Sequence, residues 1–117
     1  DSSLQTHLLS HWVREEGAFT LEEAGRMITY DTATSWGFHD RGLLREGMIA
    51  DITIFDPDSI EPRMPEVVND LPSGAKRLKQ YAQGMLATIV AGEVVLKDNQ
   101  HTGALPGQLL RGPLFFR

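Results

Sequence analysis

The chain has 117 residues, 41% of them hydrophobic and 23% charged, with a formal net charge of -5. This length suits one domain with a modest core, and the composition excludes a disordered chain. Cysteine is absent, which excludes disulfides and thiolate metal sites, while scattered basic residues and short apolar runs exclude a nucleic-acid partner and a membrane span.

Helical patterns fill roughly the first 37 residues. The first helix, with Ser2 or Ser3 as its N-cap, is predicted to end at Gly17. A second helix begins at a capping box, in which the side chains of Thr20 and Glu23 each accept a backbone N–H of the other residue. The apolar stripe of the first helix, at the spacing of one helical face, comprises Leu4, Leu8, Leu9, Trp12 and Val13.

A third, short helix is predicted before Gly37, with Thr29 or Asp31 as its cap. Trp12 and Trp36 lie on the apolar stripes of these helices and are expected to anchor a core. The chain does not open on Met, and its helical pattern starts at the fourth residue. We therefore expect it to be part of a longer polypeptide.

Strand patterns follow the helices. Ile49–Phe55 is rich in Ile and Thr and predicts a strand covered on both faces. Prolines within residues 57–65 predict an irregular connection. A hairpin is predicted from the strand patterns of Leu86–Val90 and Glu93–Lys97, joined at Ala91-Gly92. A two-residue hairpin turn usually needs a left-handed first residue, which alanine tolerates poorly, so we expect either another turn type or a strain of about 1 kcal/mol at Ala91. A loop-like tail is predicted from Gly103, Pro106, Gly107, Gly112 and Pro113.

One long stretch between the helices and the strands resembles a known junction. "ITYDTATSWGFHDRGLLREGMIADITIFD" is similar to the segment that closes the catalytic barrel in the amidohydrolase superfamily, although Asp31-Thr32 stand where family members commonly have Asn-Pro. The stretches "LLSHWVREEGAFTLEEA", "NDLPSGAKRLKQYAQG" and "HTGALPGQLLRG" narrow the resemblance to N-acyl-D-amino-acid deacylases. The positions that match the junction are Thr29, Ala33, Gly37, Gly42, Gly47, Ala50, Asp51 and Asp56.

This resemblance implies an α+β arrangement in two parts. Residues 1–42 correspond to the last helices of a (β/α)₈ barrel of the TIM type. Residues 43–117 correspond to the C-terminal strands and loops of a small β-sandwich-like domain, which the superfamily builds from both ends of its chain. Thr29, Gly42, Gly47 and Asp51 are the residues expected to form the structural junction between the two parts.

The family's reaction is hydrolysis of the amide of an N-acyl-D-amino acid by a zinc-bound water, with an aspartate moving the proton. Its implied ligands are a His-x-His pair and further residues on barrel strands, and none of those motifs occurs in this chain. Asp1-Ser2-Ser3 does not match the Ser-Asp-Ala-Gly-like motif of the catalytic aspartate. We therefore expect zinc in the parent enzyme and no catalytic or metal residue here, so that this part alone is inactive.

The chain has four histidines that are potential metal ligands. His7 and His11 stand four residues apart on a helix, a spacing that can bind zinc. No glutamate adjoins the first of them and no third ligand is evident, so exposed or packing roles are favoured. His39 in the junction turn and His101 in a predicted loop are expected to be capping or surface groups.

Two further groups have a functional and a structural interpretation. Asp51 is either a buried acid–base carboxylate or, as the resemblance favours, an acceptor of backbone N–H groups from the preceding turn. Lys76, Arg77 and Lys79 could bind a substrate carboxylate or phosphate. On a short helical stretch such residues more often form a solvated face, which is the interpretation we adopt.

Two rival functions stay open. The chain could be a stand-alone interaction or structural module, with a partner adding strands to its sheet edges, or its parent could be a hydantoinase-like hydrolase of cyclic amides. The expected partner is the rest of the parent chain, its barrel and N-terminal strands. Exposed apolar faces also favour a homo-oligomer. No nucleic-acid or membrane partner is expected, and the lack of cysteine and of a signal peptide fits a cytoplasmic location.

Overall fold

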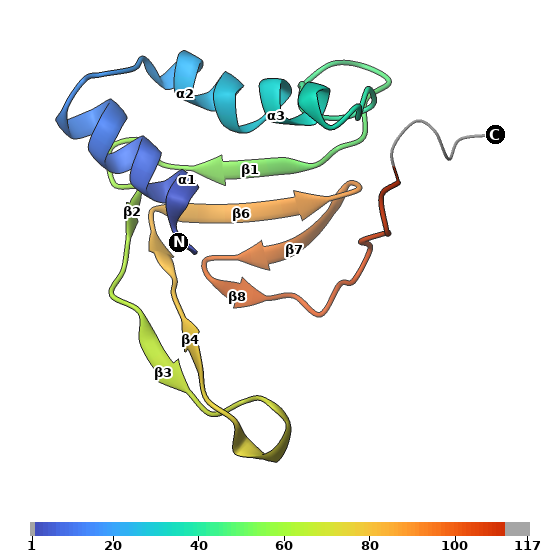
Figure 1. Cartoon of the computed structure of the whole chain (residues 1–117). Helices are drawn as coiled ribbons and strands as arrows, with labels where there is room; N and C mark the ends of the chain where they lie inside the picture. Colours follow the sequence, from blue (N-terminus) through green and yellow to red (C-terminus); the bar gives the residue numbers. More distant parts are fainter. Residues whose placement is uncertain (1, 112–117) are drawn as a thin grey trace.

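The structure is a computed structural model that describes residues 2–111. The predictions for Asp1, Gly112 and Pro113 lie outside the described residues. Helices occupy the first third of the chain, and antiparallel strands follow between Ile52 and His101, so the predicted α+β order is confirmed. Figure 1 shows the helices along the β1 side of a sheet, from which a hairpin extends away. The helical elements are α1 (Leu4–His7), η1 (Leu8–Glu15), α2 (Leu21–Ile28), α3 (Tyr30–Ser35) and η2 (Pro72–Gly74).

The capping box at the start of α2 is confirmed. Thr20 Oγ1 accepts the Glu23 N–H at 3.1 Å, and Glu23 Oε2 accepts the Thr20 N–H at 2.8 Å. The other predicted caps are wrong in detail. Ser3 and Thr29 precede α1 and α3 but cap neither with a side chain. The Thr29 hydroxyl instead donates to the Gly25 carbonyl at 2.7 Å.

The predicted first helix changes its winding part of the way along. After the single turn of α1, η1 is a π-helix, and the Glu16 N–H reaches the His11 carbonyl five residues back at 2.9 Å. Apolar pairs recur at 8–9 and 12–13, a spacing of four residues. The same spacing is typical of an amphipathic α-helix, so the sequence pattern does not predict the change of winding.

The main sheet has the strand order β1-β6-β7-β8, with every neighbouring pair antiparallel. The predicted hairpin is present as β6 and β7. Ala91 and Gly92 at its turn have φ of 49° and 83°, so Ala91 does adopt the left-handed conformation and the strain alternative is the correct one. The strands of this sheet are β1 (Ile52–Phe55), β6 (Met85–Val90), β7 (Glu93–Lys97) and β8 (Gln100–His101).

The connection over residues 57–65 is irregular apart from the two-residue strand Glu61–Pro62, much as predicted, whereas the basic stretch after it is not helical. The basic stretch is extended because it pairs antiparallel with the segment just after the connection, Val67 opposite Leu78 and Glu66 opposite Lys79. These partners lie more than ten residues apart, beyond the reach of a local pattern. The additional strands are β2 (Glu61–Pro62), β3 (Glu66–Val68), β4 (Arg77–Lys79) and β5 (Ala82–Gln83).

The buried core is small. Leu9, Ala24 and Ile60 are the buried hydrophobic residues among those described, and they join η1, α2 and the turn after β1. Trp36 is 72% exposed and Trp12 is 44% exposed, so the prediction that both tryptophans anchor a core is wrong. The chain leaves much of its helical apolar surface open.

Strand β1 is also less covered than expected. Ile54 is 43% exposed and Thr53 is exposed as well, so the strand is not covered on both faces. Within the described residues, no helix is both long and apolar enough to cross a bilayer.

Candidate functional site

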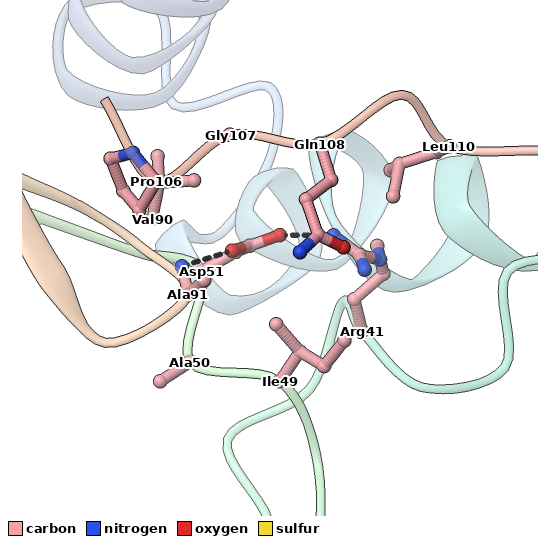
Figure 2. Close-up of a pocket in the computed structure, with 10 residues that line it drawn as sticks. All are labelled: Arg41, Ile49, Ala50, Asp51, Val90, Ala91, Pro106, Gly107, Gln108 and Leu110. Carbon is pink, nitrogen blue, oxygen red and sulfur yellow. Dashed lines mark hydrogen bonds and ion pairs between the residues drawn. The ribbon is translucent and has the colours of Figure 1, made fainter.

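Asp51 ties together three segments of the chain at the junction before β1 (Figure 2). Its Oδ1 accepts the backbone N–H of Ala91, in the β6–β7 turn, at 2.9 Å. Its Oδ2 pairs with Nη1 of Arg41 at 2.5 Å. The Arg41 side chain is 16% exposed and also reaches Asp40 through Nε at 3.2 Å. The carboxylate therefore holds the loop after α3 and a distant hairpin turn at one point.

The predicted role of Asp51 is structural, and its contacts are of that kind, but the donor differs from the prediction. The N–H comes from Ala91, forty residues later in the chain, and not from the preceding turn. The Asp51 side chain is 31% exposed, so it is no deeply buried acid. Two backbone bonds reinforce the tie: Gly92 N–H to the Ala50 carbonyl at 2.9 Å and Ile49 N–H to the Asp40 carbonyl at 2.7 Å.

Gly42 and Gly47, the two glycines expected at the junction, are glycine for different structural reasons. Gly42 has φ of +89°, and a Cβ there would lie 2.9 Å from Cβ of Ala33 and 3.2 Å from the Thr29 carbonyl oxygen. This position therefore requires both the left-handed conformation and close approach to α3. Gly47 has φ of +84° but open space around it, so only its backbone conformation favours glycine.

A cleft of about 460 Å³ lies beside the contacts of Asp51 with Arg41 and Ala91, which we call the Asp51 tie. The cleft separates the junction from the C-terminal segment that includes residues 106–110. The two charges in it, Arg41 and Asp51, are paired with each other. Gln108 from the tail projects over them in Figure 2. The charged groups of the cleft therefore hold the junction together, and neither of them is left unpaired to bind a ligand. It is lined by Arg41, Ile49, Ala50, Asp51, Val90, Ala91, Pro106, Gly107, Gln108 and Leu110.

A second, more apolar groove of about 650 Å³ separates the first helices from β1. We call it the helix–strand groove. Its floor is Ile52 and Phe55 of β1, and Leu9 and Ile28 contribute from the helices. The remaining lining residues are Gln5, Thr6, Gly25, Thr29, Gly42, Leu43, Leu44, Asp51, Thr53 and Met85.

The turn after β1 is locked by a second aspartate, Asp56. Its Oδ2 accepts the Ser59 hydroxyl at 2.6 Å, and its Oδ1 accepts the Asp58 N–H at 3.0 Å. The Ser59 bond first, and the Asp58 bond next, lower the pKa of the Asp56 carboxyl below its usual value. A Cβ at Gly84 would lie 2.7 Å from the Ile60 nitrogen, so the backbone just before β6 packs directly against this turn.

The four histidines do not converge. His39 is exposed in the junction loop. His101 is also exposed, but it lies in β8, whereas the sequence predicted a loop there. His7 and His11 stack on the helix with ring centroids 5.0 Å apart. Among the residues that the structure describes, no group of three or more potential ligands is placed to hold a metal ion.

Arg77 and Lys79 of the basic stretch in β4 contact residues in or next to the β3–β4 hairpin. Arg77 forms a two-pronged bond to Asp70, with both N···O distances 2.6 Å. That bond lowers the pKa of the Asp70 carboxyl and raises the pKa of Arg77. Lys79 Nζ lies 4.6 Å from the centre of the Tyr81 ring, while Lys76 is exposed. These residues form no shared anion site.

Two arginines with structural roles were missed by the sequence reading. Arg41 completes the Asp51 tie, and Arg14 Nη1 donates to the Ile60 carbonyl at 2.6 Å and the Pro57 carbonyl at 3.3 Å. Arg14 thereby fixes η1 to the turn after β1. No local pattern marks these contacts, because Asp51 lies ten residues after Arg41 and the two carbonyls lie more than forty residues after Arg14.

Comparison with known proteins establishes the class to which this fold and junction belong. The model of the amidohydrolase family matches residues 2–96, and the chain belongs to that family. Within it, the resemblance to N-acyl-D-amino-acid deacylases is confirmed. N-acyl-D-aspartate deacylase of Alcaligenes xylosoxydans xylosoxydans is 37% identical over 106 residues, which is 90% of this chain and 19% of that enzyme.

Further relatives include a D-aminoacylase, known from sequence and from a solved structure, and a dihydroorotase. D-aminoacylase of the same organism is 29% identical over 88% of this chain and 19% of its own length. A solved D-aminoacylase structure aligns with a TM-score of 0.65 and 27% identity, covering 86% of this chain and 19% of that one. A dihydroorotase of Lactobacillus johnsonii is 45% identical over a shorter stretch, 42% of this chain and 12% of its own. The chain thus spans about a fifth of the length of the deacylases it matches.

Proposed function

We propose that the chain is a structural, C-terminal part of a zinc-dependent hydrolase that converts N-acyl-D-amino acids to D-amino acid and carboxylate. The observation that carries this proposal is the 37% identity to N-acyl-D-aspartate deacylase along 90% of the chain, which covers only 19% of that enzyme. Four fifths of such a polypeptide would therefore be supplied by residues outside this sequence.

The catalytic chemistry is assigned to those other residues. A catalytic zinc takes three protein ligands and keeps one position open for water or substrate. The described residues do not fit such an ion, because no group of three or more potential ligands converges among them. The D-aminoacylase in a second solved structure, also 27% identical, is described as having a binuclear metal center. We place the corresponding metal, its ligands and the general base in the rest of the polypeptide.

The role assigned to this chain is to complete the fold around that catalytic part. Trp36 is 72% exposed and Leu44 is 83% exposed, and the helix–strand groove is lined mainly by apolar side chains. Burying such surface against a larger body is favourable by about 25 cal/mol per Å². Strand β1 lies at one side of its sheet and can pair with a further strand there. The helices would shield the barrel, and the strands would complete the small domain.

The test uses the native polypeptide that carries this sequence, assayed after addition of zinc. N-acetyl-D-aspartate, N-acetyl-D-glutamate and an apolar N-acetyl-D-amino acid are the substrates, with the L-enantiomers as controls. We expect hydrolysis of at least one D-substrate, abolished by a chelator and restored by zinc. Hydrolysis of none of them would refute the deacylase assignment.

A cyclic-amide hydrolase is the second candidate, because the dihydroorotase match reaches 45% identity over 49 residues. Dihydroorotate and a substituted hydantoin in the same assay distinguish the two. If the native polypeptide has only the 13.0 kDa mass of this chain, a third function replaces both. The chain would then act as an interaction module that uses its exposed apolar faces to self-associate or to bind a partner.

A further inference from the structure

We propose that the β3–β4 hairpin forms one wall of the entrance to the catalytic site of the whole polypeptide. This placement rests on the proposed function, in which the helical segment belongs to a (β/α)₈ barrel. β3 and β4 form a separate two-stranded sheet, and Figure 1 shows their hairpin extending away from the rest of the molecule.

The segment that leads into the hairpin runs along the first helix, α1 and η1, toward its N-terminal end. Near the C-terminal end of the helix, Nη1 of Arg14 donates to the Ile60 carbonyl at 2.6 Å, just before β2. At the N-terminal end, the Ser2 hydroxyl donates to Oε1 of Gln80 at 2.9 Å, and Nε2 of Gln80 donates to the Arg63 carbonyl at 2.7 Å. β2 lies between these contacts and packs against both α1 and η1. The hairpin therefore starts at the N-terminal end of the helix and extends past it (Figure 1).

In a (β/α)₈ barrel, the N-terminal end of a helix marks the catalytic side. Each helix follows a barrel strand, so this end lies at the carboxyl end of that strand, where the active site is built. A hairpin that starts there stands beside the catalytic face. Because an extended strand rises by about 3.3 Å per residue, the chain from Arg63 to Asp70 can reach up to about 23 Å further. That reach allows the hairpin to border the loops that follow the barrel strands.

The hairpin carries an apolar pair that its own chain leaves open. Val67 and Leu78 stand directly opposite each other, so their side chains share one face. Val67 is 63% exposed and Leu78 is 68% exposed. A two-stranded hairpin is marginally stable in water and gains stability by packing against another body. We assign that body to the catalytic part, because this chain covers only 19% of the deacylase it matches and the hairpin stands at the catalytic side.

The end of the hairpin also brings positive charge to this entrance. Between residues 69 and 79 there are three cations and one acid, whereas the whole chain has a formal net charge of -5. Arg77 pairs with Asp70, while Lys76 is exposed and forms no ion pair among the described residues. An N-acyl amino acid is an anion through its α-carboxylate, and N-acyl-D-aspartate carries a second carboxylate. A cationic rim would therefore favour the capture of such substrates at low ionic strength.

The position of the hairpin is tested by photo-crosslinking in the full polypeptide that carries this sequence. The photoreactive residue p-benzoylphenylalanine replaces Leu78, and in the matched control it replaces Val94, a 40% exposed residue of β7. Mass spectrometry of proteolytic peptides identifies the crosslinked partner. A mixture of isotope-labelled and unlabelled protein separates crosslinks within one polypeptide from those between two copies.

We expect position 78 to crosslink, within its own polypeptide, to the loops that follow the barrel strands, and position 94 to give different peptides. Crosslinks from position 78 to a second copy, to no other part of the polypeptide, or to the same peptides as position 94 would overturn the proposal.

The role of the cations is tested by kcat/KM for N-acetyl-D-aspartate in the same polypeptide. Lys76→Glu should lower this value by about three- to tenfold at low ionic strength and by less in high salt. Lys97→Glu makes the same change of net charge at an exposed position of β7 and should have a smaller effect. Equal losses in the two variants would overturn the role given to Lys76.

The crosslinking does not depend on activity, so it separates this placement from the proposed function. If position 78 crosslinks to the barrel loops and no D-substrate is hydrolysed, the deacylase assignment fails and the position of the hairpin stands. If a D-substrate is hydrolysed and position 78 crosslinks elsewhere, the placement of the hairpin alone fails.

Discussion

The carboxylate of Asp51 accepts the backbone N–H of Ala91 across forty positions of sequence, at 2.9 Å. The same side chain pairs with Arg41, so one residue joins the helical segment, the entry to β1 and the turn of the main hairpin. Losing it would remove the acceptor of the Ala91 N–H and one of the two carboxylate partners of Arg41 at the same time.

Replacing Asp51 with Ala should lower the free energy of unfolding by about 1–3 kcal/mol, the usual result of removing a charged hydrogen-bond partner. Asp51→Asn keeps an acceptor for Ala91 but removes the ion pair with Arg41, so it should cost less. Denaturant unfolding measures both. Glu46→Ala, at an exposed acid of the same loop, is the control and should change stability little. Equal losses in Asp51→Ala and Glu46→Ala would contradict the proposed tie.

Gly42 should be far less tolerant of substitution than Gly47. In Gly42→Ala the new Cβ meets Ala33 at 2.9 Å and the backbone has φ of +89°, which combines a steric clash with conformational strain. Gly47→Ala has the strain alone, worth about 1 kcal/mol. Thermal unfolding of the two variants should show the larger drop for Gly42→Ala. A larger drop for Gly47→Ala would show that the close approach to α3 is not a constraint.

Ala91 offers a stabilising change. Its φ of 49° costs free energy for alanine but not for glycine, and its N–H bond to Asp51 does not depend on the side chain. Ala91→Gly should therefore raise the free energy of unfolding by up to about 1 kcal/mol. Ala87→Gly, in the middle of β6, should lower it and serves as the matched control. A destabilised Ala91→Gly variant would mean that the alanine methyl group contributes contacts that outweigh the strain.

The bond between Asp70 and Arg77 makes the β3–β4 hairpin sensitive to acid. The folded pKa of Asp70 is lowered, first by the hydrogen bond from Arg77. Its stabilising effect is therefore complete above the unfolded pKa, near 3.9 for aspartate, and is lost as the pH falls through the lower folded value.

Amide exchange of the hairpin residues, followed from neutral pH down to acid, measures this loss. Asp70→Asn removes the titrating group, so the acid-dependent part of the change should disappear. Asp58→Asn, at another exposed aspartate, should keep it. An identical acid response in wild type and Asp70→Asn would rule out this pair as the cause.

The sequence predicted the parts of the fold that local patterns encode. The capping box of Thr20 and Glu23 and the hairpin of β6 and β7 were predicted because each pattern lies within a few neighbouring residues. The pairing of β3 with β4 was not predicted, because its partners are separated by a loop and the basic stretch was expected to be helical. The expectation that Thr29, Gly42, Gly47 and Asp51 form the structural junction came from the family resemblance and not from a local pattern.

The contacts at that junction could not be predicted. Nothing in the sequence near Asp51 indicates that Ala91 is its donor, and Arg41 stands ten residues before it in a polar loop. The exposure of Trp36 was predicted wrongly for a related reason. A helical stripe shows which side chains share a face, but not whether a body is present to cover that face.

The Asp51 tie also has a consequence for how this sequence can be divided. A boundary after residue 42, where the barrel-like and sandwich-like parts are predicted to meet, leaves Arg41 on one side and Asp51 on the other. A chain beginning at residue 43 would lose the arginine and keep the acid. Transplanting the β segment onto an amidohydrolase barrel would therefore need a host loop with its own arginine, so we expect the two predicted parts to be inherited, exchanged and engineered together.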